Sequence, residues 1–277
     1  MGNNKHELED VRYFWENNPL FYGESKYEIG TKEFFEEHRK VVVDDCFAGD
    51  LDERIFPDDE HRNRVLDLGC GVGFWTVELG SRRCELIASA DLTKKAIEIT
   101  KKRCAFYNVK SHLSVQNAEE LGFKDEQFSH VICLGVIHHT PNPEKCVAEI
   151  ARVLKKGGTA VISVYYKNIL LRNWFWMRIP FRIFSKIVKL RGRGREGFLL
   201  SRDVNDLVRM FDGAENPIGI AFSDEEFSNM VGKYFVVEKT FYHFFPARAL
   251  PFTLPKRIHK ILDHLFPFMI YKKLRKK

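Results

Sequence analysis

The sequence has 277 residues, of which 44% are hydrophobic and 30% charged, and its formal net charge is +6. This length fits one α/β domain with an appended part, or at most two small domains. The longest apolar run, Val131 to Ile137, is far shorter than the roughly 18 residues that a membrane span needs. The opening MGNNKHELED lacks the basic and apolar regions of a secretory signal. We therefore expect a cytoplasmic protein.

The six cysteines form no CxxC pair, so we expect reduced thiols, no disulfide framework and no metal site. Charge is distributed unevenly along the chain. Residues 1–166 carry 22 basic and 28 acidic side chains, whereas residues 167–209 carry 11 and 3, and residues 246–277 carry 9 and 1. Such basic stretches attract nucleic acid, anionic lipid or an acidic substrate, or they are solvated helix faces. This charge leaves peripheral membrane contact open.

The hydrophobic pattern predicts two amphipathic helices first, over 3–17 and 31–47, and then a polar linker over 49–62. Strands are predicted over 65–68, 86–90, 112–116, 129–135 and 159–166. Helices are predicted between them, one ending near 81 and the others spanning 93–107 and 143–155. We expect Lys155 to Gly158 to end the last of these helices. Alternation of this kind indicates βαβ units, with helices on both faces of a mainly parallel sheet.

The later third is predicted to begin with two basic, aromatic helices over 168–190, interrupted at Pro180, and a cationic loop over 191–195. Further helices are expected over 202–211, 223–232 and 254–265, and strands over 234–244 (antiparallel to the sheet) and 268–271. The residues from Lys272 onward are expected to hang free.

A glycine-rich loop, Gly69-Cys70-Gly71-Val72-Gly73, follows the first predicted strand. Its spacing is GxGxG, and Phe74 stands where a dinucleotide-binding fingerprint needs a small residue. Asp67 precedes the loop, where a carboxylate repels a diphosphate but accepts from an ammonium group. Asp91 ends the second strand, which suits hydrogen bonds from a ribose diol. Residues 117–119 would flank an adenine.

Three segments, VLDLGCGVGFWT, ASADLT and QNAEELGFKDEQFSHVICLGVIHHTPNPEKCVAEIARVLKKGG, resemble the class I S-adenosylmethionine-dependent methyltransferases. The resemblance is closest to the branch that includes ubiquinone, menaquinone and natural-product methyltransferases. It implies S-adenosylmethionine as cofactor, held by Asp67, Gly69, Cys70, Gly71, Gly73, Asp91, Leu92, Asn117, Ala118, Glu119, Leu134 and Gly135. Members usually have Asp at the position of Asn117, so the amide oxygen is expected to accept from the adenine amino group.

The resemblance also implies the architecture. We expect a Rossmann-like, seven-stranded, mainly parallel sheet whose last strand is antiparallel. The expected divisions are an N-terminal helical lid (1–60), a cofactor-binding core (61–167), a basic helical insertion that caps the substrate (168–222) and a C-terminal completion of the sheet with a basic tail (223–277). The oligomeric state, including a homodimer, stays open.

Two histidines in the turn after the fourth strand, His138 and His139, are the candidate bases, because imidazole titrates near neutral pH. In related natural-product O-methyltransferases a histidine of this turn is proposed as the base. The alternative is that one packs against the cofactor and the other caps a helix. The turn lacks the Asn/Asp-Pro-Pro-aromatic motif of adenine-N6 enzymes, and the sequence has no Pro-Cys, so a nucleic-acid substrate is disfavoured.

Aromatic residues supply the substrate-site candidates. They are Tyr13, Trp15, Tyr22 and Tyr27, in the segment expected to form a lid or to attach a helix to the sheet, and Tyr165, Tyr166 and His243 at strand ends. We expect methyl transfer to a small molecule, at oxygen, after deprotonation assisted by a histidine. The alternatives are an RNA or lipid methyltransferase, a nicotinamide oxidoreductase, which the loop spacing disfavours, and a non-catalytic cofactor-binding scaffold.

Overall fold

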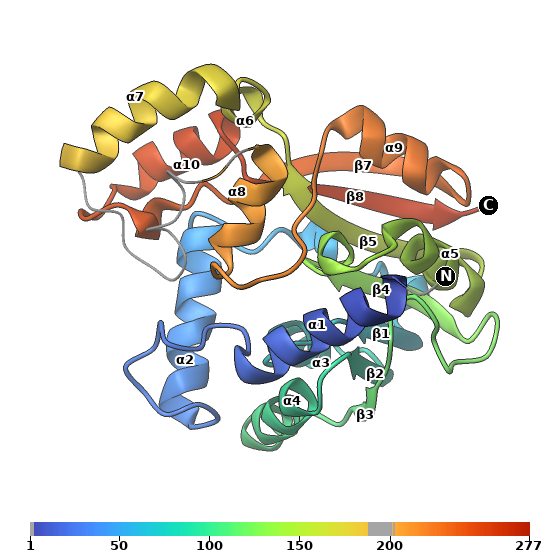
Figure 1. Cartoon of the computed structure of the whole chain (residues 1–277). Helices are drawn as coiled ribbons and strands as arrows, with labels where there is room; N and C mark the ends of the chain where they lie inside the picture. The colour runs from blue at the N-terminus through green and yellow to red at the C-terminus, as the bar shows by residue number, and fades with distance from the viewer. Residues whose placement is uncertain (1–2, 188–200, 202) are drawn as a thin grey trace.

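The computed structural model describes residues 3–187, 201 and 203–277, which form one mixed sheet with helices on both of its faces (Figure 1). The strands lie in the order β3-β2-β1-β4-β5-β8-β7, and the short β6 pairs with β5 beside this path. The strand bounds are β1 Arg64–Leu68, β2 Leu86–Asp91, β3 His112–Val115, β4 Phe128–Leu134, β5 Leu154–Tyr166, β6 Ala221–Phe222, β7 Phe235–His243 and β8 Met269–Lys276. The prediction of a mainly parallel sheet with an antiparallel last strand is confirmed, and β6 adds a strand that was not predicted.

The α-helices lie close to their predicted ranges. Their bounds are α1 Asn3–Asn17, α2 Lys32–Val41, α3 Phe74–Ser81, α4 Lys94–Phe106, α5 Pro143–Val153, α6 Ile169–Arg172, α7 Trp174–Ile187, α8 Val204–Phe211, α9 Asp224–Gly232 and α10 Lys256–Leu265. N-cap side chains mark the starts of several helices, though not those of α3 and α10. Asn142, for example, accepts a hydrogen bond from the Lys145 N–H at 3.1 Å, and Pro143 follows at the first helical position.

Two apolar clusters fill the space on the two faces of the sheet. Successive strand residues point to opposite faces, so Leu66 joins one cluster while Val65 joins the other. Helices α5 and α9 supply Ile150 and Phe227 to the first cluster, and both side chains are fully buried. Burial on both faces explains why the central strands read as continuous apolar runs rather than as alternating ones.

Two helix predictions are wrong in detail. Helix α5 ends at Val153, and residues 154–158 begin β5 instead of ending the helix. The strand passes Gly157 at φ +70°, a conformation that glycine adopts without strain. Helix α7 continues through Pro180, and the interruption lies earlier, at Asn173. There the Asn173 side chain donates to the Ile169 carbonyl and ends the short helix α6.

Two predictions near the C-terminus are also wrong. Strand β7 is antiparallel to β8, which is itself antiparallel to β5, so β7 runs in the direction of the parallel strands. Residues 272–276 do not hang free but extend β8, and Lys272 and Lys273 are buried. Their ammonium groups pair with Asp224 and Asp58, which allows two cations to enter the sheet. The predicted loop 191–195 lies outside the described residues.

The N-terminal helix α1 crosses the sheet near the carboxyl ends of its parallel strands, beside α4 (Figure 1). Val11 and Phe14 are its buried apolar side chains, and Glu16 accepts from the backbone N–H of Lys95 at 3.1 Å. Among the described residues, no helix is both long and apolar enough to cross a membrane.

Candidate active site

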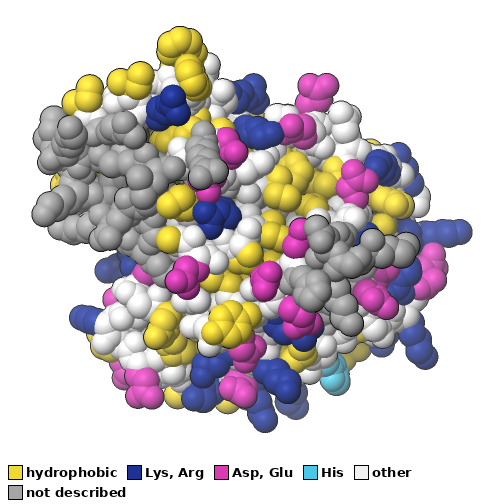
Figure 2. Space-filling view, in the orientation of Figure 1, with side chains coloured by type: hydrophobic (Ala, Val, Ile, Leu, Met, Phe, Trp, Pro, Cys, Tyr) yellow, Lys and Arg dark blue, Asp and Glu magenta, His cyan; other side chains and the backbone are white. Residues whose placement is uncertain are grey.

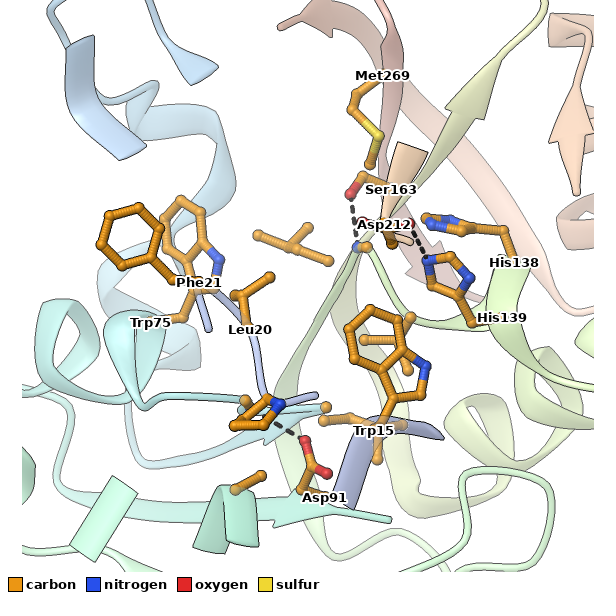
Figure 3. A pocket seen from close by; sticks show the side chains of 18 of the residues that line it. Trp15, Leu20, Phe21, Trp75, Asp91, His138, His139, Ser163, Asp212 and Met269 are labelled. Carbon is orange, nitrogen blue, oxygen red and sulfur yellow. Dashed lines mark hydrogen bonds and ion pairs between the residues drawn. The ribbon is translucent and has the colours of Figure 1, made fainter. Parts of the chain in front are cut away.

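A cavity of about 360 Å³ lies at the carboxyl ends of β1, β2, β4 and β5, under α1 (Figure 3). Parallel α/β sheets bind their ligands at this edge, because the loops that follow the strands diverge there. The sequence-predicted residues that line the cavity are Trp15, Gly69, Gly71, Asp91, Leu92, Asn117, Ala118, Leu134, Gly135, His138, His139 and Tyr165. The fold therefore brings most of the candidate site together around one volume.

The glycine loop has the backbone geometry that its composition predicted. Gly69 has φ +77°, and a Cβ there would lie 2.1 Å from Cγ2 of Val136, so only glycine fits. Gly71 has φ +52° and donates its N–H to Oδ2 of Asp91 at 3.0 Å. The N–H groups of Gly69 and Cys70 donate to the Ala90 carbonyl, and that of Gly73 to the Cys70 carbonyl. These four N–H groups of the loop all donate to groups of the protein, so they are not available to bind a diphosphate.

Asp91 is the acidic side chain on this wall. Its Oδ1 accepts from the N–H and hydroxyl of Thr93, both at 3.0 Å, while Oδ2 accepts from Gly71. A carboxylate offers about four acceptor positions, so one remains for a ligand hydroxyl. Burial raises the pKa of Asp91, against the effect of these hydrogen bonds.

Apolar groups complete the wall next to Asp91, and they suit a purine ring more than a charged group. Leu92 and Ala118 line the cavity together with Asn117. Oδ1 of Asn117 accepts from the Glu119 N–H at 3.0 Å in a local turn, so the oxygen expected to meet an adenine is already engaged. With one open acceptor, apolar flanks and no free amide cradle, the wall fits an adenosyl group without phosphates.

Four residues expected at the cofactor lie outside the cavity lining: Asp67, Cys70, Gly73 and Glu119. Asp67 is only 2% exposed and accepts from the Thr76 hydroxyl at 2.6 Å, beneath the glycine loop. Burial raises the pKa of Asp67 to about 7. Glu119 instead accepts from the Asn142 N–H at 2.7 Å, at the start of α5.

The two histidines lie on the opposite wall, in different surroundings (Figure 3). His138 is 1% exposed, its ring is centred 4.2 Å from that of Tyr165, and its Nδ1 has no hydrogen-bond partner among the described residues. Burial, helped by neighbouring His139, lowers the pKa of His138 far below its usual value. His138 is therefore a neutral packing group.

His139 is held at both ring nitrogens. Nδ1 lies 2.7 Å from the Ile218 carbonyl, and Nε2 lies 3.2 Å from Oδ2 of Asp212. The same Asp212 oxygen accepts from the Tyr165 hydroxyl at 2.6 Å. Because a carbonyl only accepts, Nδ1 carries a proton, and Nε2 faces the carboxylate. Asp212, at the end of α8, also lines the cavity and was missed, since no motif surrounds it.

Of the predicted substrate contacts, Trp15 and Tyr165 reach the cavity, and the Trp15 ring is centred 5.2 Å from that of His139. Tyr13, Tyr22 and Tyr27 are exposed and lie outside the lining. Tyr166 packs against Tyr242 instead.

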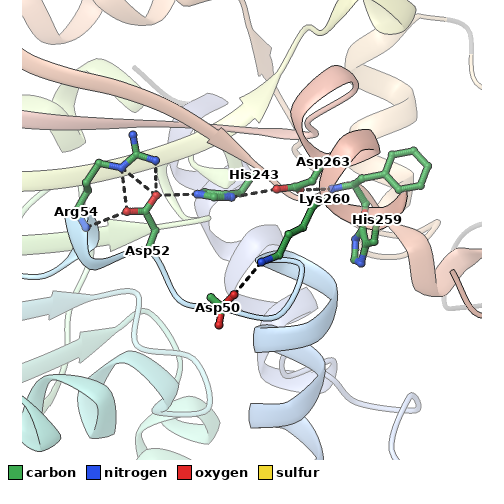
Figure 4. Close-up of polar contacts among 8 residues, drawn as sticks. Asp50, Asp52, Arg54, His243, His259, Lys260 and Asp263 are labelled. Atoms are coloured by element: carbon green, nitrogen blue, oxygen red, sulfur yellow. Dashed lines mark hydrogen bonds and ion pairs between the residues drawn. The ribbon is translucent and has the colours of Figure 1, made fainter. Parts of the chain in front are cut away.

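His243 also lies outside the cavity lining. Its Nε2 lies 2.9 Å from Asp52 and its Nδ1 3.1 Å from Asp263 (Figure 4). Burial lowers the pKa of His243, but the two carboxylates outweigh this effect and raise it overall. His243 therefore connects the N-terminal linker to α10 rather than contacting a ligand.

The cavity has further walls that the sequence did not reveal. They come from α2 and the residues just after it, from α3 and β5, and from the C-terminal third, and include His38, Phe47, Trp75, Ser163, Phe244, Arg248 and Met269. The buried guanidinium of Arg103 donates to Nδ1 of His38 at 3.2 Å, which fixes the His38 proton on Nε2. Ser163 accepts from the Gly135 N–H at 3.1 Å and so supports the turn after β4.

Comparison with known proteins agrees with this geometry. Residues 66–162 match the methyltransferase domain family. The chain carries a methyltransferase domain. The domain includes β1 to β4, most of β5 and the cavity wall around Asp91, and it implies S-adenosylmethionine as cofactor.

The relatives and solved structures extend the likeness to the fold. A ubiquinone biosynthesis O-methyltransferase of Alkalilimnicola ehrlichii is 31% identical over 106 residues, which are 38% of this chain and 42% of that protein. The chain spans about half the length, or less, of the curated relatives it matches. A Thermotoga maritima S-adenosylmethionine-dependent methyltransferase, described as a possible histamine N-methyltransferase, has a TM-score of 0.53 at 16% identity, covering 96% of this chain and 100% of that one. A chain of the complex between the Haloferax volcanii Trm112 methyltransferase activator and a putative methyltransferase has a TM-score of 0.55 at 14% identity, covering 88% and 94%.

Proposed function

We propose that this protein transfers the methyl group of S-adenosylmethionine to a hydroxyl oxygen of a small, largely apolar molecule. The observation that carries the proposal is the composition of one cavity. One wall, with the glycine loop and Asp91, fits an adenosyl group, and the facing wall holds the linked side chains of His139, Asp212 and Tyr165. A donor site and a group that takes up protons therefore share one enclosed volume.

S-adenosylmethionine supplies an electrophilic methyl group on a sulfonium, and little beyond alignment, water exclusion and proton removal is needed for its transfer. Asp91 accepts one ribose hydroxyl, while Gly69 and Gly71, which line the cavity without side chains, leave room for the rest of the cofactor. The aromatic side chain of Trp15, from α1, covers the side of His139 and limits the access of water. These residues account for binding and alignment.

Proton removal is assigned to the pair formed by His139 and Asp212. The acceptor O–H bond breaks and its proton comes to lie between Nε2 of His139 and Oδ2 of Asp212. An O–C bond to the methyl carbon forms, and the C–S bond of the donor breaks. The electron pair of that bond leaves with sulfur, so the products are a methyl ether and S-adenosylhomocysteine. Tyr165 keeps Asp212 in position through its 2.6 Å hydrogen bond. His138 packs behind the pair and takes no proton.

The acceptor class follows from the rest of the lining. Phe47, Trp75, Phe244 and Met269 give this part of the cavity an apolar, partly aromatic surface. Rings and hydrocarbon chains fit such a surface better than a sugar or a nucleotide does. A quinone precursor, the substrate class suggested by the names of the relatives, belongs to this type.

The experiment is label transfer from methyl-tritiated S-adenosylmethionine into a fractionated lysate. Counts in the organic-soluble small-molecule fraction are expected, whereas counts in RNA, or none at all, would contradict the proposal. Both His139→Asn and Asp212→Asn should lower turnover by about 10²- to 10⁴-fold, as loss of a general base does. Affinity for S-adenosylhomocysteine should stay unchanged. Glu215→Gln, an exposed substitution near Asp212, is the matched control. If His139→Ala keeps full turnover, the assigned base is wrong.

A further inference from the structure

Two helices, α7 and α10, expose apolar side chains that the other described residues do not cover. On α7 these are Phe175, Trp176, Ile179 and Ile183, each between 59% and 70% exposed. The opposite side of α7 is anchored by Trp174, which is 6% exposed and packs into the core. Figure 2 shows hydrophobic side chains gathered at the edge of the molecule where Figure 1 places α7, next to basic side chains. Helix α7 is therefore apolar on both sides.

Helix α10 has its polar and apolar faces inverted relative to an ordinary surface helix. Its buried residues are polar: His259 lies 3.0 Å from the Phe245 carbonyl, and Asp263 accepts from the Phe245 N–H at 2.9 Å. Its apolar residues Ile258, Ile261 and Leu265 are 46% to 57% exposed. Soluble helices place isoleucine and leucine inward, so an outward apolar face indicates contact with something apolar.

The two helices lie in the same corner of the molecule (Figure 1). The side chain of Asn168, which caps α6 just before α7, donates to the Pro267 carbonyl just after α10 at 2.9 Å. We call the exposed apolar side chains of α7 and α10 together the apolar corner.

The two sequence segments that contain the apolar corner carry many more basic than acidic side chains. Residues 167–195 contain no Asp or Glu, and Asp263 is the single acidic residue of 246–277. Asp263 is buried and turned toward His243, so it does not offset the cations outside. Arg178 and Arg257 are exposed beside the apolar side chains, whereas Lys256 and Lys260 face Asp44 and Asp50 at 4.0 and 2.9 Å. Basic and apolar side chains in this arrangement suit a surface with negative charge outside and an apolar interior.

We propose that the apolar corner docks on a lipid bilayer with anionic headgroups, with α7 lying in the plane of the interface. Fourteen residues give α7 a length of about 21 Å, which suits a helix that lies on a membrane. A second copy of this chain fits less well. A twofold contact would set the same cationic face against itself, which costs free energy. The proposal does not depend on the methyl acceptor.

The test is flotation of the full chain with vesicles. Vesicles of phosphatidylcholine with about one-third phosphatidylglycerol should carry the protein, and pure phosphatidylcholine should carry much less. Raising the salt concentration should release the protein from the anionic vesicles, because salt screens the attraction. Binding to neither kind of vesicle, or equal binding to both, would overturn the proposal.

Two paired variants assign the binding to the apolar corner. Trp176→Ser with Ile179→Ser, and separately Ile258→Ser with Ile261→Ser, should each weaken vesicle binding about tenfold or more. The control pair, Val115→Ser with Val236→Ser, replaces side chains of 45% and 54% exposure elsewhere and should bind as the unchanged protein does. Unaltered affinity for S-adenosylhomocysteine shows that each variant is folded. Wild-type-like binding by both corner variants overturns the proposal, as does a dimer in sedimentation that these variants dissociate.

Discussion

The cavity has two halves of different origin. The half made by β1, β2 and β4 lies inside the segment that matches the methyltransferase domain family, and its residues follow one another at short, regular spacings. The half made by α8, β8 and the segment around Phe244 lies outside that segment. In the function that we propose, the first half holds S-adenosylmethionine and the second shapes the acceptor site.

This difference explains what could be predicted from the sequence. Gly69 and Gly71 were identifiable because both have positive φ angles, and at Gly69 a Cβ would also collide with Val136. Asp91 was identifiable because it ends a strand, a position fixed by the fold. Asp212, in contrast, reaches His139 only after the insertion has folded back over the sheet. Nothing in its neighbouring sequence marks it.

Asp67 shows a limit of motif reasoning inside the first half. Its place before the glycine loop predicts a ligand contact, but its carboxyl group lies outside the cavity lining. Residues two apart in a strand share a face, so Asp67 points the same way as Val65, whose cluster also contains Leu79 of α3. Its carboxyl group accordingly meets Thr76 of α3 rather than the cavity.

Two glycines with similar positive φ angles, of which one lines the cavity, allow a matched comparison. Gly135 and Gly157 have φ +75° and +70°, and a Cβ at either would meet nothing within 4 Å. Substitution by alanine strains both by about 1–2 kcal/mol, but only Gly135 lines the cavity. Gly135→Ala should weaken S-adenosylhomocysteine binding about tenfold or more in calorimetry, and Gly157→Ala should not. Equal affinities in the two variants would place the ligand elsewhere.

Asp67→Asn tests the buried carboxyl against the cofactor role. The pKa of Asp67 is about 7 in the fold and about 3.9 in an unfolded chain. Between about pH 4 and pH 7 the Asp67 carboxyl group is therefore protonated in the native state and ionised in the unfolded chain. The free energy of unfolding consequently falls as the pH rises through this range. Asparagine does not ionise, so Asp67→Asn avoids this loss of stability. Its melting temperature should exceed that of the wild type at pH 8 and approach it near pH 4. A variant that is less stable at pH 8 would contradict this explanation.

The smallest expected effect concerns His243, in the second half. Its pKa is raised in the fold, so the stability it contributes is full below its unfolded pKa of about 6.5 and is lost as the pH rises through the folded value. His243→Gln should therefore lower the melting temperature at pH 6 by a few degrees and have less effect at pH 9. The exposed His264→Gln is the control on the neighbouring helix. A pH-independent difference would show that the two carboxylates do not hold an imidazolium.

Calorimetric titration with S-adenosylhomocysteine and, separately, with NADH tests the central claim most directly. The cavity geometry predicts one-to-one binding of S-adenosylhomocysteine and no binding of NADH, because the loop amides are not free for a diphosphate. Asp91→Asn should weaken S-adenosylhomocysteine binding about tenfold or more, the loss of a hydrogen bond to a charged acceptor, while Asp67→Asn should leave it nearly unchanged. Binding of NADH without S-adenosylhomocysteine, or wild-type affinity in Asp91→Asn, would contradict the account.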